Sequence, residues 1–375
     1  KNPRSIKEFR PISLCNVIYK IISKCLVNRL RPLLDGMISP TQSAFIPGRL
    51  ISDNALIAFE CMHSLSTLKD LRGEYCAYKL DLAKAYDRVD WQFLQSMMGA
   101  LGFAPQWIKW VMTCVTSVKF AVRFNGQLLQ SFSPSQGLRQ GDHLSPYLFL
   151  FVAEALSLLL NDACARGVLQ EFRLTRRAPG ISHLLFADDS LLFFKASFDQ
   201  ALAIKNILIV YEKGTGQMLS PDKCSIMFGK KCSLEKQVTI MVILKITVDG
   251  FEDKYLGLPV PEGRMKAGMF QYTKDKFLKR LSDWIEKYAS CGVKEDLIKL
   301  VIQALPVYAM GIFIFPASLC EELSQIIRNL WWGDEEDRRK THWVAWDKLT
   351  RPKGRGGMGF PDLRLFNQAL LAKQT

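Results

Sequence analysis

Apolar side chains recur along this chain at two different spacings, which together predict a mixture of helices and strands. Over residues 16–34 they recur every three or four positions with Lys and Arg between them, as in a helix with one buried face. Over Tyr75–Leu82 apolar residues occupy alternate positions, which predicts a strand with Leu80 on one face and Asp81 on the other.

The same patterns predict the other elements. Ser52 and Asp53 suit the N-cap of a helix that runs toward Leu68. The elements expected next are helices from Trp91 and from Pro105, a hairpin over 120–132 turning at Asn125-Gly126, a helix over 144–164, a hairpin over 183–195, a helix over 199–213 and a strand over 224–228. From Met265 onward the pattern is helical, so we expect an α+β protein with a boundary near Pro259–Pro261.

Length and composition allow more than one compact unit. The 375 residues are 49% hydrophobic and 23% charged, which suffices for two or three cores. The most apolar run, Tyr147–Leu160, contains Glu154 and is shorter than the roughly 20 residues that cross a membrane. We therefore expect a buried helix there and no membrane. Because the chain opens with Lys1 rather than Met, we also expect a piece of a longer protein.

Charge and cysteine usage narrow the class of protein. The formal charge is +14, from 50 Lys and Arg against 36 Asp and Glu. Such an excess attracts nucleic acids, although a basic surface kept for solubility explains it as well. The ten cysteines and four histidines stand at spacings that match no zinc site. We expect reduced thiols in an intracellular protein.

Carboxylates interrupt the apolar pattern at two places. Asp81 ends the strand predicted after Tyr75, and Asp188-Asp189 separate the apolar runs Leu184–Phe186 and Leu191–Phe194. An ionised carboxylate beside an apolar core is costly unless its charge is compensated. Mg²⁺ compensates it well, because it takes a few carboxylates and fills its other positions with water and phosphate. Taken alone, Asp188-Asp189 is explained better by a solvated turn.

Seven short blocks follow one another in order along the chain. They are Phe9–Asn16, Gln42–Phe45 with Pro47–Arg49, Lys79–Val89, Gln136–Asp142, Phe186–Asp189, Tyr255–Gly257 and Ala369–Gln374. In these blocks the chain resembles the reverse transcriptases of non-LTR retrotransposons, and most closely those of plant LINE-type elements. The resemblance covers nearly the whole sequence, and seven ordered blocks are a specific signal.

The resemblance implies the right-hand polymerase fold, in which a palm sheet is flanked by helices. Its parts would be partial fingers over 1–75, a palm with the catalytic motifs over 76–258, and a helical thumb with a basic C-terminal segment over 259–375. Asp81, Asp188 and Asp189 would be the catalytic residues. Asp81 and Asp188 would be the main ligands of two Mg²⁺ ions (or of Mn²⁺), with Asp189 assisting and the Leu82 carbonyl as a further ligand.

The resemblance also assigns five residues to the substrate, and each has a plainer explanation. Tyr86 would pack under the sugar of the incoming nucleotide and exclude a 2′-hydroxyl, unless it is an ordinary core tyrosine. Arg10 would meet the triphosphate, unless it forms a surface ion pair. Gln140 and Gly141 would lie beside nucleotide and template, although a plain turn also explains Gly141. Lys223 would protonate the departing pyrophosphate, although a solvated lysine explains it as well.

Three features closer to the C-terminus bear on nucleic-acid contact. Tyr255-Leu256-Gly257 resembles the hairpin that grips the primer, although this tripeptide is common. We expect the tryptophans of the last third in a helical core rather than stacked on bases; they are Trp331, Trp332, Trp343 and Trp346. Residues 338–375 hold nine Lys or Arg against two Asp, which suits phosphate contact or a solvated loop.

These observations lead to one expected function and two alternatives. We expect an RNA-directed DNA polymerase of a non-LTR retrotransposon, which extends a primer 3′-hydroxyl with deoxynucleoside triphosphates. Its partners would be an RNA template and a DNA primer, and the resemblance implies action in the nucleus. The first alternative is a catalytically inactive, nucleic-acid-binding remnant of such an element. The second is a relative that works in intron splicing or in another reverse-transcribing element.

Overall fold

The chain divides into two compact units in a computed structural model. The structure describes residues 12–67, 74–248, 250–251, 254–260, 270–282, 290–333 and 340–374. Unit 1 comprises residues 1–256 and 261–263, and unit 2 comprises residues 257–260 and 264–375. The division falls within a few residues of the boundary expected near Pro259–Pro261. The assignment of these parts to fingers, palm and thumb stays a prediction.

The centre of unit 1 is a four-stranded antiparallel sheet with the strand order β4-β5-β1-β6. Its strands are β1 (Tyr75–Leu80), β4 (His183–Phe186), β5 (Asp189–Lys195) and β6 (Ser225–Phe228). β1 lies in the middle, and five of its six residues are buried. A strand that is covered on both faces needs apolar residues at nearly every position, which explains the continuous apolar runs around the aspartates.

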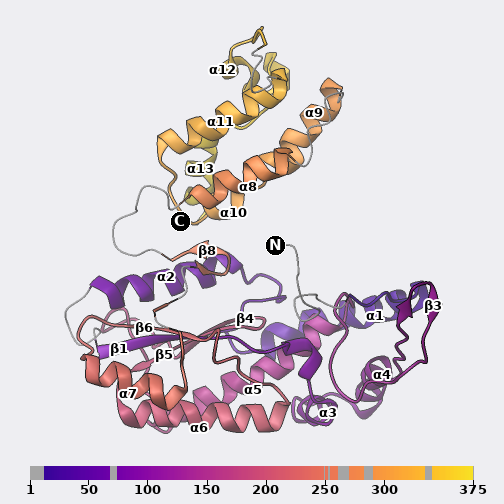
Figure 1. The fold of residues 1–375 in the computed structure, drawn as a ribbon, viewed down its shortest axis with the longest axis vertical. Helices are drawn as coiled ribbons and strands as arrows, with labels where there is room; N and C mark the ends of the chain where they lie inside the picture. Colours follow the sequence, from indigo (N-terminus) through magenta and orange to yellow (C-terminus); the bar gives the residue numbers. More distant parts are fainter. Residues whose placement is uncertain are drawn as a thin grey trace. The chain divides into compact units, whose positions relative to one another are not determined.

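Helices cover both faces of this sheet (Figure 1). Helix α2 (Ile51–Thr67) lies along one face, and α5 (Ser145–Ala165) and α6 (Phe198–Thr215) lie along the other. The remaining elements of unit 1 are α1 (Val17–Leu30), α3 (Trp91–Ala100), α4 (Pro105–Thr116), the hairpin β2 (Arg123–Phe124) and β3 (Gln127–Leu128), α7 (Leu234–Leu244) and β7 (Lys254–Tyr255). Short 3-10 turns span Arg31–Gly36 and Ala85–Arg88. The α+β class predicted from the sequence is confirmed.

Helix α5 is longer than the apolar run that signalled it. Its 21 residues are long and apolar enough to cross a membrane by length and composition alone. However, 61% of the most apolar 18-residue stretch of this helix is buried inside the protein, where Phe149 and Phe151 are fully buried. Among the described residues α5 is the one helix that is long and apolar enough to cross a membrane. Its burial identifies it as the core helix of unit 1.

Several element boundaries differ from the sequence prediction, and one of them is the end of β1, which stops at Leu80 instead of Leu82. Ser52 and Asp53 do not cap α2, because the helix already begins at Ile51 and both residues lie in its first turn. Asp189 does not belong to the bend, because it pairs with Phe186 as the first residue of β5. The predicted hairpin at Asn125-Gly126 is confirmed, and both residues have the positive φ that such a turn needs.

Unit 2 is built from helices. They are α8 (Gln271–Ser282), α9 (Cys291–Leu297), a π-helical turn (Ile298–Ile302), α10 (Val307–Met310), α11 (Ala317–Trp332), α12 (Trp346–Leu349) and α13 (Leu363–Ala372); the unit also holds β8 (Leu258–Pro259) and a 3-10 turn (Lys353–Arg355). Phe360 packs between Trp331 and Trp346. Phe360 is fully buried, and Trp331 and Trp346 are half-buried against it, whereas Trp332 stacks on His342 and Trp343 is 81% exposed.

The loop between β3 and α5 approaches the chain after β1 so closely that one position requires glycine. Gly137 has φ +92°, and a Cβ at this residue would lie 2.7 Å from the Asp87 carbonyl oxygen. The backbone N–H of Gly137 donates to the Val89 carbonyl, and the Trp91 indole N–H donates to the Gly137 carbonyl. A side chain would therefore push the loop away from Asp87.

We predict that Gly137→Ala destabilises the protein much more than Gly126→Ala. Both glycines have positive φ, but nothing lies within 4 Å of a Cβ at Gly126. Gly126→Ala should cost only the backbone strain of about 1 kcal/mol, whereas Gly137→Ala adds overpacking and should cost roughly 3 kcal/mol. Urea unfolding of the two variants measures the difference, and equal losses would contradict the close approach.

Candidate active site

The pairing of β1 with β5 brings two of the predicted catalytic aspartates together. Leu80, the last residue of β1, pairs with Ser190 of β5. The same antiparallel register carried one residue further sets Asp81 opposite Asp189, and such neighbours have Cα atoms about 4.5–5.5 Å apart. Residues that are more than 100 positions apart in the sequence therefore meet at one edge of the sheet.

The third aspartate lies in the turn between β4 and β5. Phe186 pairs with Asp189, so Ala187 and Asp188 form a two-residue turn. Ala187 has φ +55°, a left-handed conformation that costs a non-glycine residue roughly 1–2 kcal/mol. Asp188 is exposed at the tip, whereas Asp189 is half-buried. Asp188 and Asp189 thus extend the carboxylate cluster from the strand end to solvent.

The chain after β6 reaches back to Asp81. The Ser220 N–H donates to the Asp81 carbonyl oxygen at 2.9 Å. The Lys223 ammonium lies 3.8 Å from Asp81 Oδ1, and both side chains are substantially exposed. Lys223 therefore adds positive charge beside Asp81, and its role toward the pyrophosphate stays a prediction.

The donor set of this cluster fits a hard divalent cation. It consists of oxygen atoms, from Asp81, Asp188 and Asp189, and Mg²⁺ prefers oxygen ligands. Leu82 pairs with Leu219 through bonds made by the Ala83 N–H and the Asp81 carbonyl, so this pairing does not use the Leu82 carbonyl. Among the described residues, no three His, Cys, Asp or Glu side chains converge into a ready-made metal cage. Asp81, Asp188 and Asp189 are among these described residues, so their side chains stand at neighbouring strand ends without forming a three-carboxylate metal group in this structure.

Tyr86 lies between the core and the carboxylates. Its ring stacks on Phe149 with 5.0 Å between centroids and 12° between planes. Burial and the negative charge of Asp188 raise the pKa of Tyr86 to about 12. The plainer explanation, a core tyrosine, accounts for the stacking on Phe149. The charge of Asp188 nevertheless acts on this phenol, so Tyr86 also borders the site.

Gln140 and Gly141 lie in a loop that Asp142 anchors. The Asp142 carboxylate accepts from the Tyr19 hydroxyl at 2.6 Å and forms an ion pair with Arg139. The Gln140 side-chain amide donates to Asp87 Oδ1 at 3.4 Å, and the Gln140 carbonyl accepts from the Ser13 N–H. Gly141 is exposed with φ +94°. The loop therefore stays attached to the segment after β1, and its tip remains accessible.

The other predicted substrate and primer residues have different surroundings. Arg10 lies outside the described residues. Tyr255 is fully buried against Phe59, and its hydroxyl donates to Asn54 Oδ1 at 2.9 Å, so its side chain anchors the chain instead of facing solvent. Leu256 (φ +49°) and Gly257 (φ +77°) follow with left-handed backbones. Contact of these three residues with a primer stays a prediction.

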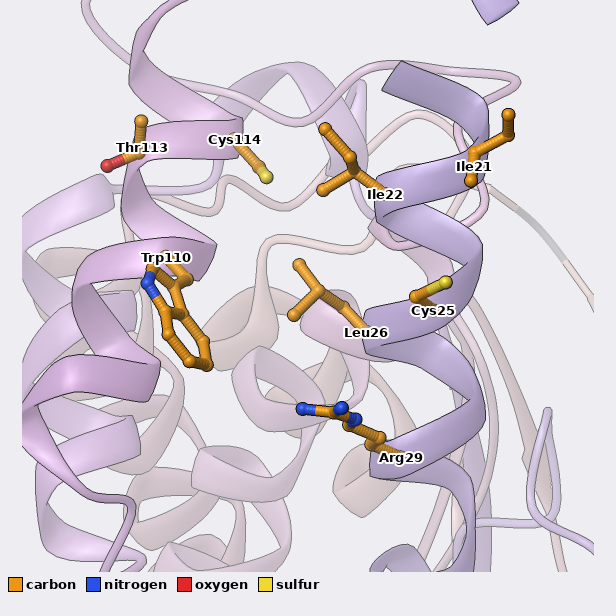
Figure 2. A pocket seen from close by; sticks show the side chains of 8 residues that line it. All are labelled: Ile21, Ile22, Cys25, Leu26, Arg29, Trp110, Thr113 and Cys114. Atoms are coloured by element: carbon orange, nitrogen blue, oxygen red, sulfur yellow. The ribbon is translucent and has the colours of Figure 1, made fainter. Parts of the chain in front are cut away.

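A separate apolar groove lies between α1 and α4. Figure 2 shows Trp110, Thr113 and Cys114 on α4 opposite Ile22 and Leu26 on α1. The groove has a volume of about 500 Å³, and its lining contains no carboxylate. Apolar grooves of this kind are interaction surfaces more often than sites of ionic chemistry, so the groove is not a candidate for the catalytic site.

Polar side chains that no sequence pattern pointed to lie beneath the Asp188 turn. Gln42 and Asn54 are each 1% exposed, and both donate to or accept from the backbone of the β4–β5 hairpin. The signal was present, because Gln42 stands in one of the seven blocks. The block does not indicate the role of Gln42, because only the fold brings residue 42 next to residue 187.

His183 at the start of β4 is another buried polar residue of this support. It is fully buried, and its ring nitrogens contact the Thr41 and Ser182 hydroxyls at 2.8 and 2.9 Å. Burial lowers the pKa of His183 from 6.5 to about 4. The ring is therefore neutral in the folded protein near neutral pH.

Comparison with known proteins identifies the family. The reverse transcriptase (RNA-dependent DNA polymerase) family matches residues 1–260, and the chain belongs to this family. The right-hand polymerase fold predicted from the sequence is thereby confirmed, as is the prediction of a reverse transcriptase at the level of the family.

Individual relatives are similar over parts of much longer proteins. The transposon TX1 uncharacterized 149 kDa protein of Xenopus laevis is 28% identical over 96% of this chain and 26% of its own length. The Pol polyprotein of the type-2 retrotransposable element R2DM of Drosophila melanogaster is 28% identical over 63% of this chain and 21% of its own. The chain thus spans about a quarter of these relatives.

Solved structures resemble the chain more distantly. A telomerase from Candida albicans is 12% identical, with a TM-score of 0.42 over 95% of this chain and 56% of its own.

We predict that His183 makes stability fall between pH 6.5 and 4. The pKa of this histidine is 6.5 in the unfolded chain and about 4 in the folded protein. Between these two pH values the unfolded state binds more protons, so lowering the pH favours the unfolded state over the folded protein. The loss should reach roughly 3 kcal/mol below pH 4.

The measurement is urea unfolding at several pH values for His183→Gln and, as a control, for the exposed His143→Gln. The first variant should have a flatter stability curve between pH 6.5 and 4, and the second should follow the parent. Identical slopes for all three proteins would contradict the buried neutral ring.

Proposed function

We propose that this chain is the polymerase part of a non-LTR retrotransposon protein and acts as an RNA-directed DNA polymerase. One observation carries the proposal. In a member of the reverse transcriptase family, the β1–β5 register sets Asp81 beside the Asp188-Asp189 turn. Three carboxylates at one sheet edge, with Lys223 next to them, suit the transfer of a phosphoryl group.

In this proposal Asp81, Asp188 and Asp189 hold two Mg²⁺ ions, with the Leu82 carbonyl as an additional ligand. When bound, the ions supply the positive charge that activates the attacking hydroxyl and stabilises the departing pyrophosphate. The protein contributes position, because the carboxylates stand on strands of a packed sheet. Lys223, whose ammonium lies 3.8 Å from Asp81, would give a proton to the leaving pyrophosphate oxygen.

The neighbouring side chains would position the substrates. Tyr86 stacks on Phe149, so its ring cannot retreat into the core when a nucleotide sugar approaches, and it would exclude a 2′-hydroxyl. Gln140 and Gly141 stand on the anchored loop, where they would contact the nucleotide and the template. Arg10 would bind the triphosphate, and Tyr255, Leu256 and Gly257 would place the primer.

The wider biological setting is also part of the proposal. The substrates would be an RNA template, a DNA primer and deoxynucleoside triphosphates, in agreement with the formal charge of +14. Residues 1–75 would be partial fingers, 76–258 the palm and 259–375 the thumb with its basic segment. Origin from a plant LINE-type element and action in the nucleus are proposed from the sequence resemblance.

We predict that Asp188→Asn abolishes primer extension, whereas Asp162→Asn does not. Asp162 is an exposed aspartate on α5 that pairs with Arg166, so its variant controls for a change of one charge. Loss of a ligand to the reacting centre should lower the rate of oligo-dT extension on poly-rA by at least roughly 100-fold. Binding of the template–primer, measured by fluorescence anisotropy, should change by less than about threefold.

The measurement of template–primer binding distinguishes the proposed polymerase from an inactive remnant. If the parent and Asp188→Asn bind template–primer equally and extend it equally poorly, the chain is a nucleic-acid-binding remnant. If the parent extends the primer and Asp188→Asn does so equally well, the carboxylate cluster is not the catalytic site.

A further inference from the structure

A short loop segment runs alongside β4 and passes under the catalytic turn. Gln42 pairs with Leu185 in a parallel bridge. The Leu185 N–H donates to the Thr41 carbonyl at 2.8 Å, and the Ser43 N–H donates to the Leu185 carbonyl at 3.1 Å. The segment therefore extends the sheet by one pairing, two residues before Ala187.

The side chain of Gln42 contacts the turn itself. Its Oε1 accepts from the Ala187 N–H at 3.0 Å and from the Ala44 N–H at 2.9 Å, and the residue is 1% exposed. Two N–H donors can face only an oxygen, so these contacts determine the orientation of the amide group. The Gln42 Nε2 has no hydrogen-bond partner in the described part of the chain. The Oε1 atom therefore makes the hydrogen bonds of this side-chain amide.

The contact falls on a residue with a left-handed backbone conformation. Ala187 has φ +55° and directly precedes Asp188. The turn closes on the pair Phe186–Asp189, and the Ala187 N–H inside that turn goes to Gln42. An acceptor at this point favours one orientation of the peptide before Ala187, and therefore one direction of Asp188.

Gln42 is itself held firmly. The Arg49 guanidinium donates to the Gln42 carbonyl at 2.7 Å and to the Ser39 carbonyl at 2.6 Å, and it pairs with Asp35. Glu154 of the core helix α5 accepts from the Ser39 N–H and hydroxyl at 2.9 and 2.6 Å. The segment that carries Gln42 is thus fastened to the centre of unit 1, which lets it act as a rigid support.

We propose that Gln42 is a positioning residue, which orients the Ala187–Asp188 turn for metal binding without touching the substrate. The proposal rests on the proposed polymerase function for its consequence, but the contact with Ala187 can be tested separately. Loss of the Oε1 acceptor should let the turn adopt other conformations. The catalytic step should then slow while binding of template and primer remains.

The test compares Gln42→Met with Gln200→Met. Methionine matches glutamine in length and removes the acceptor. Gln200 is the matched control, because it is 6% exposed and its Oε1 also accepts two backbone N–H groups, from Gln170 and from Lys195 at the far end of β5. Both variants therefore lose two hydrogen bonds that backbone N–H groups donate to a buried side-chain oxygen, but only Gln42→Met loses a bond from the turn.

Two readouts are used. In ¹⁵N-labelled protein, hydrogen exchange at the Ala187 amide should accelerate at least roughly tenfold in Gln42→Met, while the Leu185 amide stays protected in both variants. In primer extension, Gln42→Met should lower kcat by roughly 10- to 100-fold with KM for template–primer within about twofold of the parent. Gln200→Met should change neither readout. Gln42→Glu, which keeps a carboxyl oxygen as acceptor, should restore protection at Ala187.

The outcomes separate the two proposals. Unchanged exchange at Ala187 in Gln42→Met, or equal kcat losses in both methionine variants, overturns the positioning role. If the parent shows no extension activity but Ala187 loses protection only in Gln42→Met, the contact is supported and the polymerase function fails on its own.

Discussion

The antiparallel pairing of β1 with β5 is the constraint on which the site depends. Leu80 pairs with Ser190, and this single register decides that Asp81 stands opposite Asp189. A slip by one residue would turn every side chain of β1 to the other face of the sheet. Because five of the six β1 residues are buried between helices on both faces, that slip would exchange the side chains of two packed layers and disrupt the fit of both. Packing of the core and placement of the carboxylates are therefore the same requirement.

Grouping carboxylates beside an apolar core carries an electrostatic cost, and the neighbouring residues reduce it. Asp188 is exposed and Asp189 half-buried, so water screens their charges. Lys223 adds a positive charge 3.8 Å from Asp81. The backbone below is held by Gln42, whose acceptor satisfies the Ala187 N–H. The charged surface of the site is therefore open to solvent, whereas the side chains that support it are buried and make hydrogen bonds to the turn, an arrangement that suits a divalent cation shared with a substrate phosphate.

Local patterns in the sequence were sufficient for the parts of the fold that depend on neighbouring residues. The strand before Asp81, the core helix α5 and the turn at Asn125-Gly126 all follow from spacing and turn chemistry. The start of α2 was wrong by a few residues, because Ser52 and Asp53 suit the first helical turn as well as the cap. Asp189 was placed in the bend because two consecutive aspartates read as a turn, whereas the register pairs it with Phe186.

The support of the site could not be predicted in the same way. Gln42 and Asn54 are polar residues in segments that read as loop and helix, and nothing local marks them as buried. Their partners, Ala187 and the Leu185 carbonyl, are more than 100 residues away, so only the assembled sheet reveals them. Tyr255 is a similar case, since the block resembling a primer-contacting hairpin contains a side chain that is fully buried.

The most direct test of the shared carboxylate site is a double-mutant cycle on Mn²⁺ binding, measured by electron paramagnetic resonance. The variants are Asp81→Asn, Asp188→Asn and the double variant. If both side chains hold the same cation, each single substitution should weaken binding at least about tenfold, and the double variant should lose far less than the product of the two effects. Additive losses, or binding that neither substitution changes, would contradict a common site at the end of β1.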